Sequence, residues 1–144
     1  MRNLILFVLL LMLSGCAISK HVTPVDSTVT ISKIYVLKND KVQYEQLVDE
    51  IVSQIETLGF DSESYEGDRP KEAQHYITYT ANWTWDLAMY LTYFRATLYD
   101  DGRVLGEVEY DSKMGGLNLS KFGSAKEKIR PLMEELLAKV KRPN

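Results

Sequence analysis

Apolar residues recur along the chain with the two periods that distinguish helices from strands. Between Tyr44 and Leu58 an apolar side chain returns about every 3.6 residues, and Gly59 follows at a position where helices commonly end. Asp40 and Gln43 stand three residues apart, which predicts a capping box at the helix start. This stretch therefore predicts an amphipathic helix that starts just after Asp40 and ends near Leu58.

Alternating or continuous apolar runs predict strands over residues 29–37, 60–65, 75–85, 89–99 and 104–110. The run from His75 to Trp85 alternates strictly, as half-buried strands do. The continuous run Ile34 to Leu37 is typical of a strand buried on both faces. Between the last two strands, Asp101-Gly102 supplies the residue types that a tight hairpin turn requires.

A second capping-box pattern, Ser124 with Glu127, opens another amphipathic stretch that continues to Val140, and Pro131 is expected to kink it. The predicted order is strand, helix, strand, three meandering strands, helix. Helical faces this apolar need a sheet to cover. We therefore predict an α/β fold: a two-layer sandwich whose mixed sheet joins a right-handed βαβ unit to an antiparallel meander and carries two helices on one face.

The start of the chain follows a different pattern. Arg2 precedes an unbroken apolar run from Leu4 to Leu13, which is too short for a membrane-spanning helix of about 20 residues. A positive start, a short apolar run and small residues are typical of an export signal. We accordingly predict a cleaved signal over residues 1–15, a polar lipidated tether over 16–28 and a single domain over 29–144.

The signal ends in Leu13-Ser14-Gly15-Cys16, which resembles the lipobox of bacterial lipoproteins. The resemblance implies that the Cys16 thiol receives diacylglycerol, that the signal is cut just before it, and that the new amino group usually takes a fatty acid such as palmitate. Cys16 is the only cysteine in the chain, so it cannot form an intramolecular disulfide. Two or more acyl chains hold a protein stably on its bilayer.

The residue after Cys16 bears on which membrane holds the protein. In the Gram-negative families that the lipobox resembles, aspartate at this position tends to retain the protein in the inner membrane, and here the position is Ala17. The resemblance therefore implies the periplasmic side of the outer membrane. The inner membrane and a Gram-positive surface remain alternatives.

Composition limits the classes of partner. The formal net charge is −3, which gives no support for nucleic-acid binding, so we expect no nucleic-acid partner. Apolar residues make up 45% and charged residues 26%, as in ordinary globular domains. The part after the signal is therefore expected to fold.

A second resemblance covers most of the predicted domain. The residues that carry it run from Tyr79 through Trp83 and Trp85-Asp86 to Tyr110 and then Gly115-Gly116. This stretch is similar to an uncharacterised group of small proteobacterial envelope lipoproteins. The resemblance implies an envelope protein and brings no activity. We expect the two glycines to form a turn between sheet and last helix.

Residues with catalytic chemistry are few. Histidine occurs only at His21 and His75, so a multi-histidine metal site is not expected. Glycosidase-like or calcium chemistry would need paired carboxylates, and the candidates are Glu107, Glu109, Asp86, Asp100, Asp101 and Asp111. Turns and solvated strand faces explain these more simply. We expect no enzyme activity and no cofactor or metal, with a small hydrolase as the least favoured alternative.

Alternation in the run 89–99 places one set of side chains opposite Phe94, Ala96 and Leu98. That set is the candidate partner face: Met89, Leu91, Tyr93, Arg95 and Tyr99, with Thr97 beside them. Tyrosine and arginine are enriched at interface hot spots, although cross-strand pairs that merely cover an open sheet are the alternative. The predicted function is a non-enzymatic lipoprotein that binds an envelope partner or joins an assembly. A module for a small ligand or cell-wall glycan is the alternative.

Overall fold

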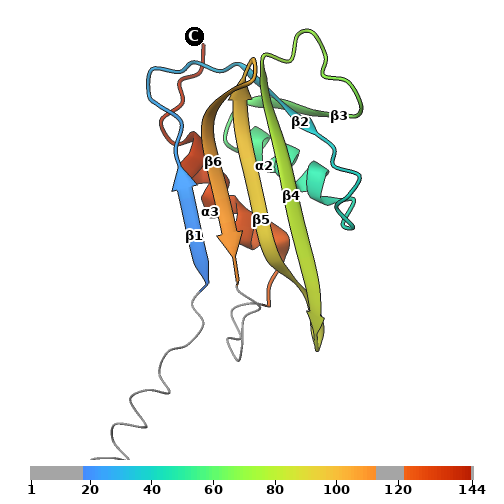
Figure 1. The fold of residues 1–144 in the computed structure, drawn as a ribbon. Helices are drawn as coiled ribbons and strands as arrows, with labels where there is room; N and C mark the ends of the chain where they lie inside the picture. The colour runs from blue at the N-terminus through green and yellow to red at the C-terminus, as the bar shows by residue number, and fades with distance from the viewer. Residues whose placement is uncertain (1–17, 113–121, 144) are drawn as a thin grey trace, which may run out of the picture.

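A computed structural model describes residues 18–112 and 122–143. Within them, a layer of strands carries both helices on one side (Figure 1). The strands are β1 (Ser19–Thr23), β2 (Lys33–Leu37), β3 (Asp61–Tyr65), β4 (His75–Asp86), β5 (Ala88–Asp100) and β6 (Arg103–Asp111), and the helices are α2 (Leu47–Thr57) and α3 (Ala125–Leu137). The predicted α/β sandwich with two helices on one face is confirmed. The predicted lipid site at Cys16 and the turn at Gly115-Gly116 lie outside the described residues.

The strands form one mixed sheet in the order β1-β6-β5-β4-β2-β3. Strand β2 runs parallel to both β3 and β4. The other neighbouring strands are antiparallel: β1 with β6, β6 with β5, and β5 with β4. The βαβ unit and the meander therefore share one sheet, as predicted, and they meet where β2 pairs with β4.

The core lies between the sheet and the two helices. Both helices present a mainly apolar stripe, and β5 supplies the centre of the sheet's matching face. These buried side chains include Leu47, Ile51 and Ile55 of α2, Ile129, Met133 and Leu136 of α3, and Phe94, Ala96 and Leu98 of β5. Alternation on β5 is thus confirmed for residues 94–98, because Phe94, Ala96 and Leu98 enter the core whereas Arg95 and Thr97 both bond Glu107 on the other face.

The two predicted helix starts have opposite outcomes. At α3 the capping box is present, with the Ser124 hydroxyl accepting from the Glu127 amide and the Glu127 carboxylate accepting from the Ser124 amide. The helix continues through Pro131 and ends at Leu137, short of the predicted Val140.

At α2 the predicted box is wrong. Residues 39–46 make turns, and the helix starts at Leu47 without a side-chain cap. The reason is Asn39, whose side chain accepts from the Lys41 amide and donates 2.7 Å to the Tyr79 carbonyl. This tertiary contact holds the chain in a turn where the local pattern favours a helix start. Gly59 ends the helix region with φ +85°, as predicted.

Strand bounds also differ from the prediction. The first predicted strand, 29–37, is regular only over β2, because Thr30 makes an isolated bridge to Lys141. The hairpin strands are longer than predicted: β4 reaches Asp86 and β5 begins at Ala88. The predicted Asp101-Gly102 turn is confirmed, with φ of 45° and 90° at its two residues.

The segment predicted as a tether, residues 16–28, belongs largely to the domain from Ser19 onward. Ser19–Thr23 form the edge strand β1, antiparallel to β6. Val25 is fully buried, and its amide donates 3.0 Å to the Leu136 carbonyl of α3. The polar sequence suggested a tether because an edge strand buries few side chains, so its pairing leaves little trace in the hydrophobic pattern.

Gly106 of β6 provides the space for this segment. A Cβ at Gly106 would lie 2.7 Å from the Thr23 carbonyl oxygen, 2.8 Å from Leu136 Cδ1 and 3.0 Å from Val25 Cγ2. Two of these atoms belong to Thr23, the last residue of β1, and to Val25 just after it, so any side chain would push this part of the chain off the sheet and the helix.

Gly106→Ala is therefore expected to lower the free energy of unfolding by about 1 to 3 kcal/mol, the usual cost of overpacking. Chemical denaturation of the purified protein measures this change. Val104→Ala, an exposed position on the same strand, serves as control and is expected to change stability by under about 0.5 kcal/mol. Equal stability of the two variants would contradict the packing of residues 23–25 against β6.

Candidate functional site

The face of the sheet opposite the helices is open (Figure 1). Tyr93, Arg95 and Tyr99 lie on this open face, as the alternation predicts, because their neighbours Phe94 and Leu98 point into the core. Tyr99 stacks on Tyr76 of β4 with ring centroids 5.0 Å apart. The open face thus presents aromatic rings held in place by their neighbours.

Charged pairs cross the centre of the open face. Arg95 Nη2 donates 2.7 Å to Glu107 Oε1, and the Thr97 hydroxyl donates 2.9 Å to Glu107 Oε2. The Tyr93 hydroxyl donates 3.1 Å to Glu109. The Arg95 hydrogen bond, assisted by that from Thr97, holds the pKa of Glu107 below its ordinary value. These contacts favour the cross-strand interpretation of the face, but the Arg95 side chain remains 48% exposed and free to contact a partner as well.

Leu91 does not belong to the partner face, and that part of the prediction is wrong. The register of β4 and β5 shifts between Asn82 and Trp83, so that Asn82 pairs with Tyr93 and Trp83 with Leu91. Thr92 is the extra residue, and it reverses the alternation on its far side. Leu91 is consequently buried in the core, at 1% exposure, and Met89 belongs to the hairpin end instead of the open face.

The carboxylates considered for catalysis are spread over the molecule. Glu107 and Glu109 lie on the open face in the pairs just described. Asp86 and Asp111 lie toward the β4–β5 hairpin end, whereas Asp100 and Asp101 lie at the opposite end.

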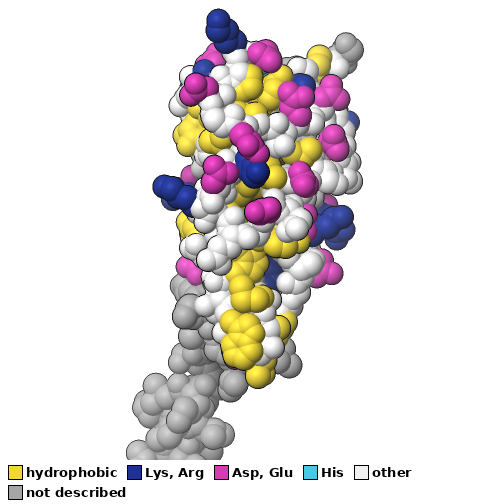
Figure 2. Space-filling view, turned by 90° about the vertical axis from the view of Figure 1, so that its right-hand side faces the viewer, with side chains coloured by type: hydrophobic (Ala, Val, Ile, Leu, Met, Phe, Trp, Pro, Cys, Tyr) yellow, Lys and Arg dark blue, Asp and Glu magenta, His cyan; other side chains and the backbone are white. Residues whose placement is uncertain are grey.

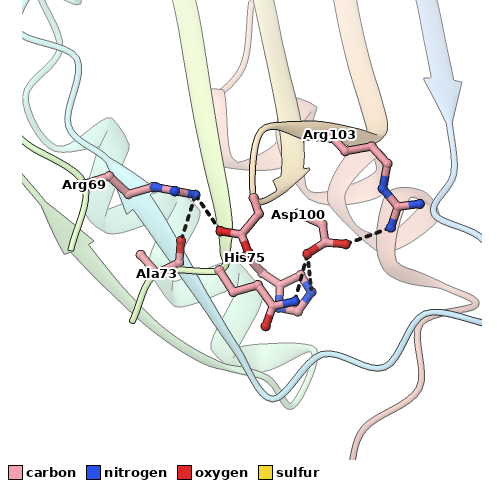
Figure 3. A network of polar contacts seen from close by, with 7 residues as sticks. Arg69, Ala73, His75, Asp100 and Arg103 are labelled. Carbon is pink, nitrogen blue, oxygen red and sulfur yellow. Dashed lines mark hydrogen bonds and ion pairs between the residues drawn. The ribbon is translucent and has the colours of Figure 1, made fainter. Parts of the chain in front are cut away.

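Asp100 and Asp101 take part in a network that ties the loop before β4 to the β5–β6 turn (Figure 3). The contacts join Gln74 and Arg103 to Asp100, at 2.8 and 2.7 Å, and Arg69 to Asp101, at 3.2 Å. Hydrogen bonds from Gln74 and Arg103 lower the pKa of Asp100. These contacts therefore stabilise the position of the loop before β4.

The two histidines take part in no cluster of metal ligands within the described residues. His75 Nε2 lies 3.9 Å from Asp100, and His21 Nε2 is within 3.5 Å of the Thr23 hydroxyl. Across residues 18–112 and 122–143, no three histidine, cysteine or acidic side chains are close enough to share a metal ion. The same two segments hold no helix with the length and apolar character to cross a bilayer.

The tip of the β4–β5 hairpin is a feature that the sequence analysis missed. Trp85, Leu87 and Met89 are 70%, 84% and 58% exposed, and the space-filling view shows apolar side chains gathered at this lower end (Figure 2). The turn is tight, since Asp86 pairs directly with Ala88. Leu87 between them has φ +62°, a conformation that non-glycine residues seldom adopt.

Beside the hairpin, a groove of about 430 Å³ opens between β4–β5, the loop before α2 and the start of α3. Tyr44 and Trp83 line it as a tilted pair with centroids 5.5 Å apart. Glu50 also lines the groove: its Oε1 accepts from the Tyr44 hydroxyl at 3.1 Å, while its buried Oε2 has no hydrogen-bond partner. The groove therefore combines aromatic surface with an unsatisfied acceptor.

Comparison with known proteins identifies the fold alone. No protein-family model matches the chain, and no curated protein matches it. Two solved structures of PelC from Paraburkholderia phytofirmans are similar, both described as dodecamers and one of them a point variant. The variant aligns with a TM-score of 0.57 at 10% identity and the other with 0.55 at 9%, each over 89% of this chain and 100% of the PelC chain.

The pKa shifts of Glu107 and Asp100 predict how stability depends on pH. Both carboxyls have folded-state pKa values below their ordinary ones, so the unfolded chain binds protons first as the pH falls. Their stabilisation is complete above the unfolded pKa, near 4, and is lost as the pH falls through the folded pKa. We expect the free energy of unfolding to decline from about pH 5 downward.

Glu107→Gln is expected to make that decline shallower, as measured by denaturant titrations at several pH values. Glu56→Gln, which removes an exposed carboxylate of α2, is the control and should keep the slope of the unmodified protein. A Glu107→Gln slope as steep as that of the control would show that the Arg95 pair contributes nothing to folding.

Proposed function

We propose that this protein is a non-enzymatic lipoprotein of the cell envelope, held on the periplasmic side of the outer membrane by acylated Cys16, and that it binds an envelope protein through the open face of its sheet. The proposal joins the lipobox at the start of the chain to the placement of β1 and to the residues on that face.

The observation that carries the proposal is that β1 begins only three residues after Cys16. Three residues reach at most about 10 Å, whereas the tether expected from the sequence would reach about 40 Å. Strand β1 is antiparallel to β6, and β6 to β5, so β1 and β5 both start at the hairpin end of the sheet. A lipid on Cys16 would therefore hold that end of the domain close to the bilayer.

The open face supports a binding role through the types of residue that it presents. Tyr93 and Arg95 sit at its centre, and these residue types dominate interface hot spots. Their hydrogen bonds to Glu109 and Glu107 hold the side chains in one geometry, so little rotamer entropy remains to be lost on binding. A role without catalysis is supported by the cross-strand pairs and the loop network that engage four of the carboxylates considered for catalysis, Glu107, Glu109, Asp100 and Asp101.

The groove beside the hairpin favours a second candidate, a binding module for a small ligand or cell-wall glycan. Sugars pack against aromatic rings and donate hydroxyl hydrogen bonds to carboxylates. Tyr44 and Trp83 supply the rings, and the unpaired Oε2 of Glu50 supplies an acceptor. This candidate ranks second because the groove is open and its acceptor is single.

The anchor is tested by Cys16→Ser. Because serine cannot take the thioether-linked diacylglycerol, we expect loss of palmitate labelling and an uncleaved or soluble product on fractionation. Ala17→Asp is a companion variant, which should keep the label and move the protein toward inner-membrane fractions. Labelled Cys16→Ser in the membrane fraction would refute the anchor, and unaltered outer-membrane residence of Ala17→Asp would refute the sorting proposal.

The binding face is tested by Arg95→Ala and Tyr93→Ala. Arg95→Ala breaks an exposed ion pair and Tyr93→Ala a half-buried cross-strand pair. Such pairs contribute only about 0.2 to 1 kcal/mol to stability, so the melting temperature should hardly change. Capture of the crosslinked envelope partner should weaken tenfold or more, equivalent to about 1.4 kcal/mol. The matched control is Arg130→Ala, which removes an exposed arginine, 3.7 Å from Glu134, on the helical side.

Equal capture by Arg95→Ala, Tyr93→Ala and Arg130→Ala would refute the open face as the binding surface. Because the PelC chains of similar fold are described as dodecamers, the mass of the purified lipoprotein in detergent should be measured by light scattering in parallel. That measurement shows whether the partner is a second copy of this chain.

A further inference from the structure

The hairpin tip extends past the rest of the sheet in the direction of the chain's start. Ser19, Asp111, Tyr93 and Asn82 lie in one row across β1, β6, β5 and β4. Beyond this row β4 continues for four residues, to Asp86, which is about 13 Å at the usual strand rise. Three residues of chain separate Ser19 from Cys16, a length that spans at most about 10 Å. The apolar tip therefore lies at the end of the sheet where β1 begins, and a lipid on Cys16 would be tied to that same end.

The residue types at the hairpin tip are not those expected of a turn that only connects two strands. A two-strand turn exposed to water usually carries glycine, asparagine or aspartate at a residue with positive φ. Here Leu87 occupies that position, and it is among the most exposed large apolar residues described. Leucine gains neither conformational ease nor burial there, and Trp85 and Met89 flank it with further exposed apolar surface. Strain combined with exposure points to a contact that the isolated domain lacks.

We propose that the tip of the β4–β5 hairpin, Trp85, Leu87 and Met89, enters the interfacial region of the same bilayer that holds acylated Cys16. This inference rests on the proposed function, since the lipid on Cys16 supplies the membrane. Tryptophan favours the boundary between headgroups and acyl chains. Asp86 beside Leu87 limits the depth, because its charge stays among the headgroups.

The two contacts reinforce each other. A tip of three side chains buries too little surface to hold a protein on a membrane by itself. Once Cys16 is anchored, the tip meets the bilayer as an intramolecular partner at high effective concentration, so a modest gain per side chain is sufficient. The lipid then prevents escape, and the tip fixes how the domain stands on the surface.

The test places the full-length, lipidated protein in vesicles of phosphatidylethanolamine and phosphatidylglycerol that contain brominated phosphatidylcholine. The chain has two tryptophans, so Trp83→Phe leaves Trp85 as the only one. We expect bromine near the headgroups to quench most of the Trp85 emission. Adding Leu87→Gly should weaken this quenching without lowering the melting temperature, because glycine suits the positive φ of that position.

The matched control moves the probe to the far end of the sheet. Val104 is exposed at 56% and lies beside the β5–β6 turn. In a chain with Trp83→Phe and Trp85→Phe, Val104→Trp should show no quenching by brominated lipid and full quenching by iodide in solution. Equal lipid quenching at Trp85 and at residue 104 would overturn the proposal, since the domain would then have no fixed orientation.

Palmitate labelling of the same samples separates the two proposals. Absence of label refutes the anchor on which the inference rests. Presence of label with a Trp85 that iodide quenches and bromine does not quench refutes the tip alone. A Trp85 protected from both quenchers also refutes it, because a second protein surface and not lipid would then cover the tip.

Discussion

Two short helices have to cover one face of a sheet whose central hairpin is far longer than they are, and this mismatch determines most of the molecule. Strand β5 has 13 residues and spans about 43 Å, whereas α3, also of 13 residues, spans only about 20 Å. The helices seal the middle of β5 at Phe94, Ala96 and Leu98. The helices do not reach the tip of the β4–β5 hairpin. They also leave the opposite face of the sheet uncovered. Both uncovered regions are where the candidate sites lie.

Much of the fold follows from local patterns in the sequence. The apolar stripes of both helices, the Ser124 capping box and the Asp101-Gly102 turn depend on residues a few positions apart, and all are present. The failures involve distant partners. Asn39 is held by the Tyr79 carbonyl, and Ser19 pairs with Asp111 at a separation of 92 residues. No window of the sequence contains both members of such a pair.

The candidate sites were predictable to a smaller degree. Simple alternation places Tyr93, Arg95 and Tyr99 on the open face, and a single extra residue, Thr92, is sufficient to turn Leu91 inward. No characteristic residue type marks this bulge, so the alternation of apolar residues in the sequence could not detect it. The hairpin tip was missed for a related reason. Asp86-Leu87-Ala88 lacks the glycine or asparagine that marks turns, although the absence of those residues between two strong strands was itself a signal.

The short connection between Cys16 and β1 bears on how the open face of the sheet is oriented relative to the membrane. If Cys16 is acylated and the hairpin tip enters the same bilayer, as proposed, the strands would stand upright on the membrane. The broad faces of an upright sheet look sideways, along the plane of the bilayer. A partner for Tyr93 and Arg95 would then arrive laterally, as a neighbour diffusing in two dimensions, and its encounters would depend on crowding within the membrane more than on concentration in the surrounding fluid.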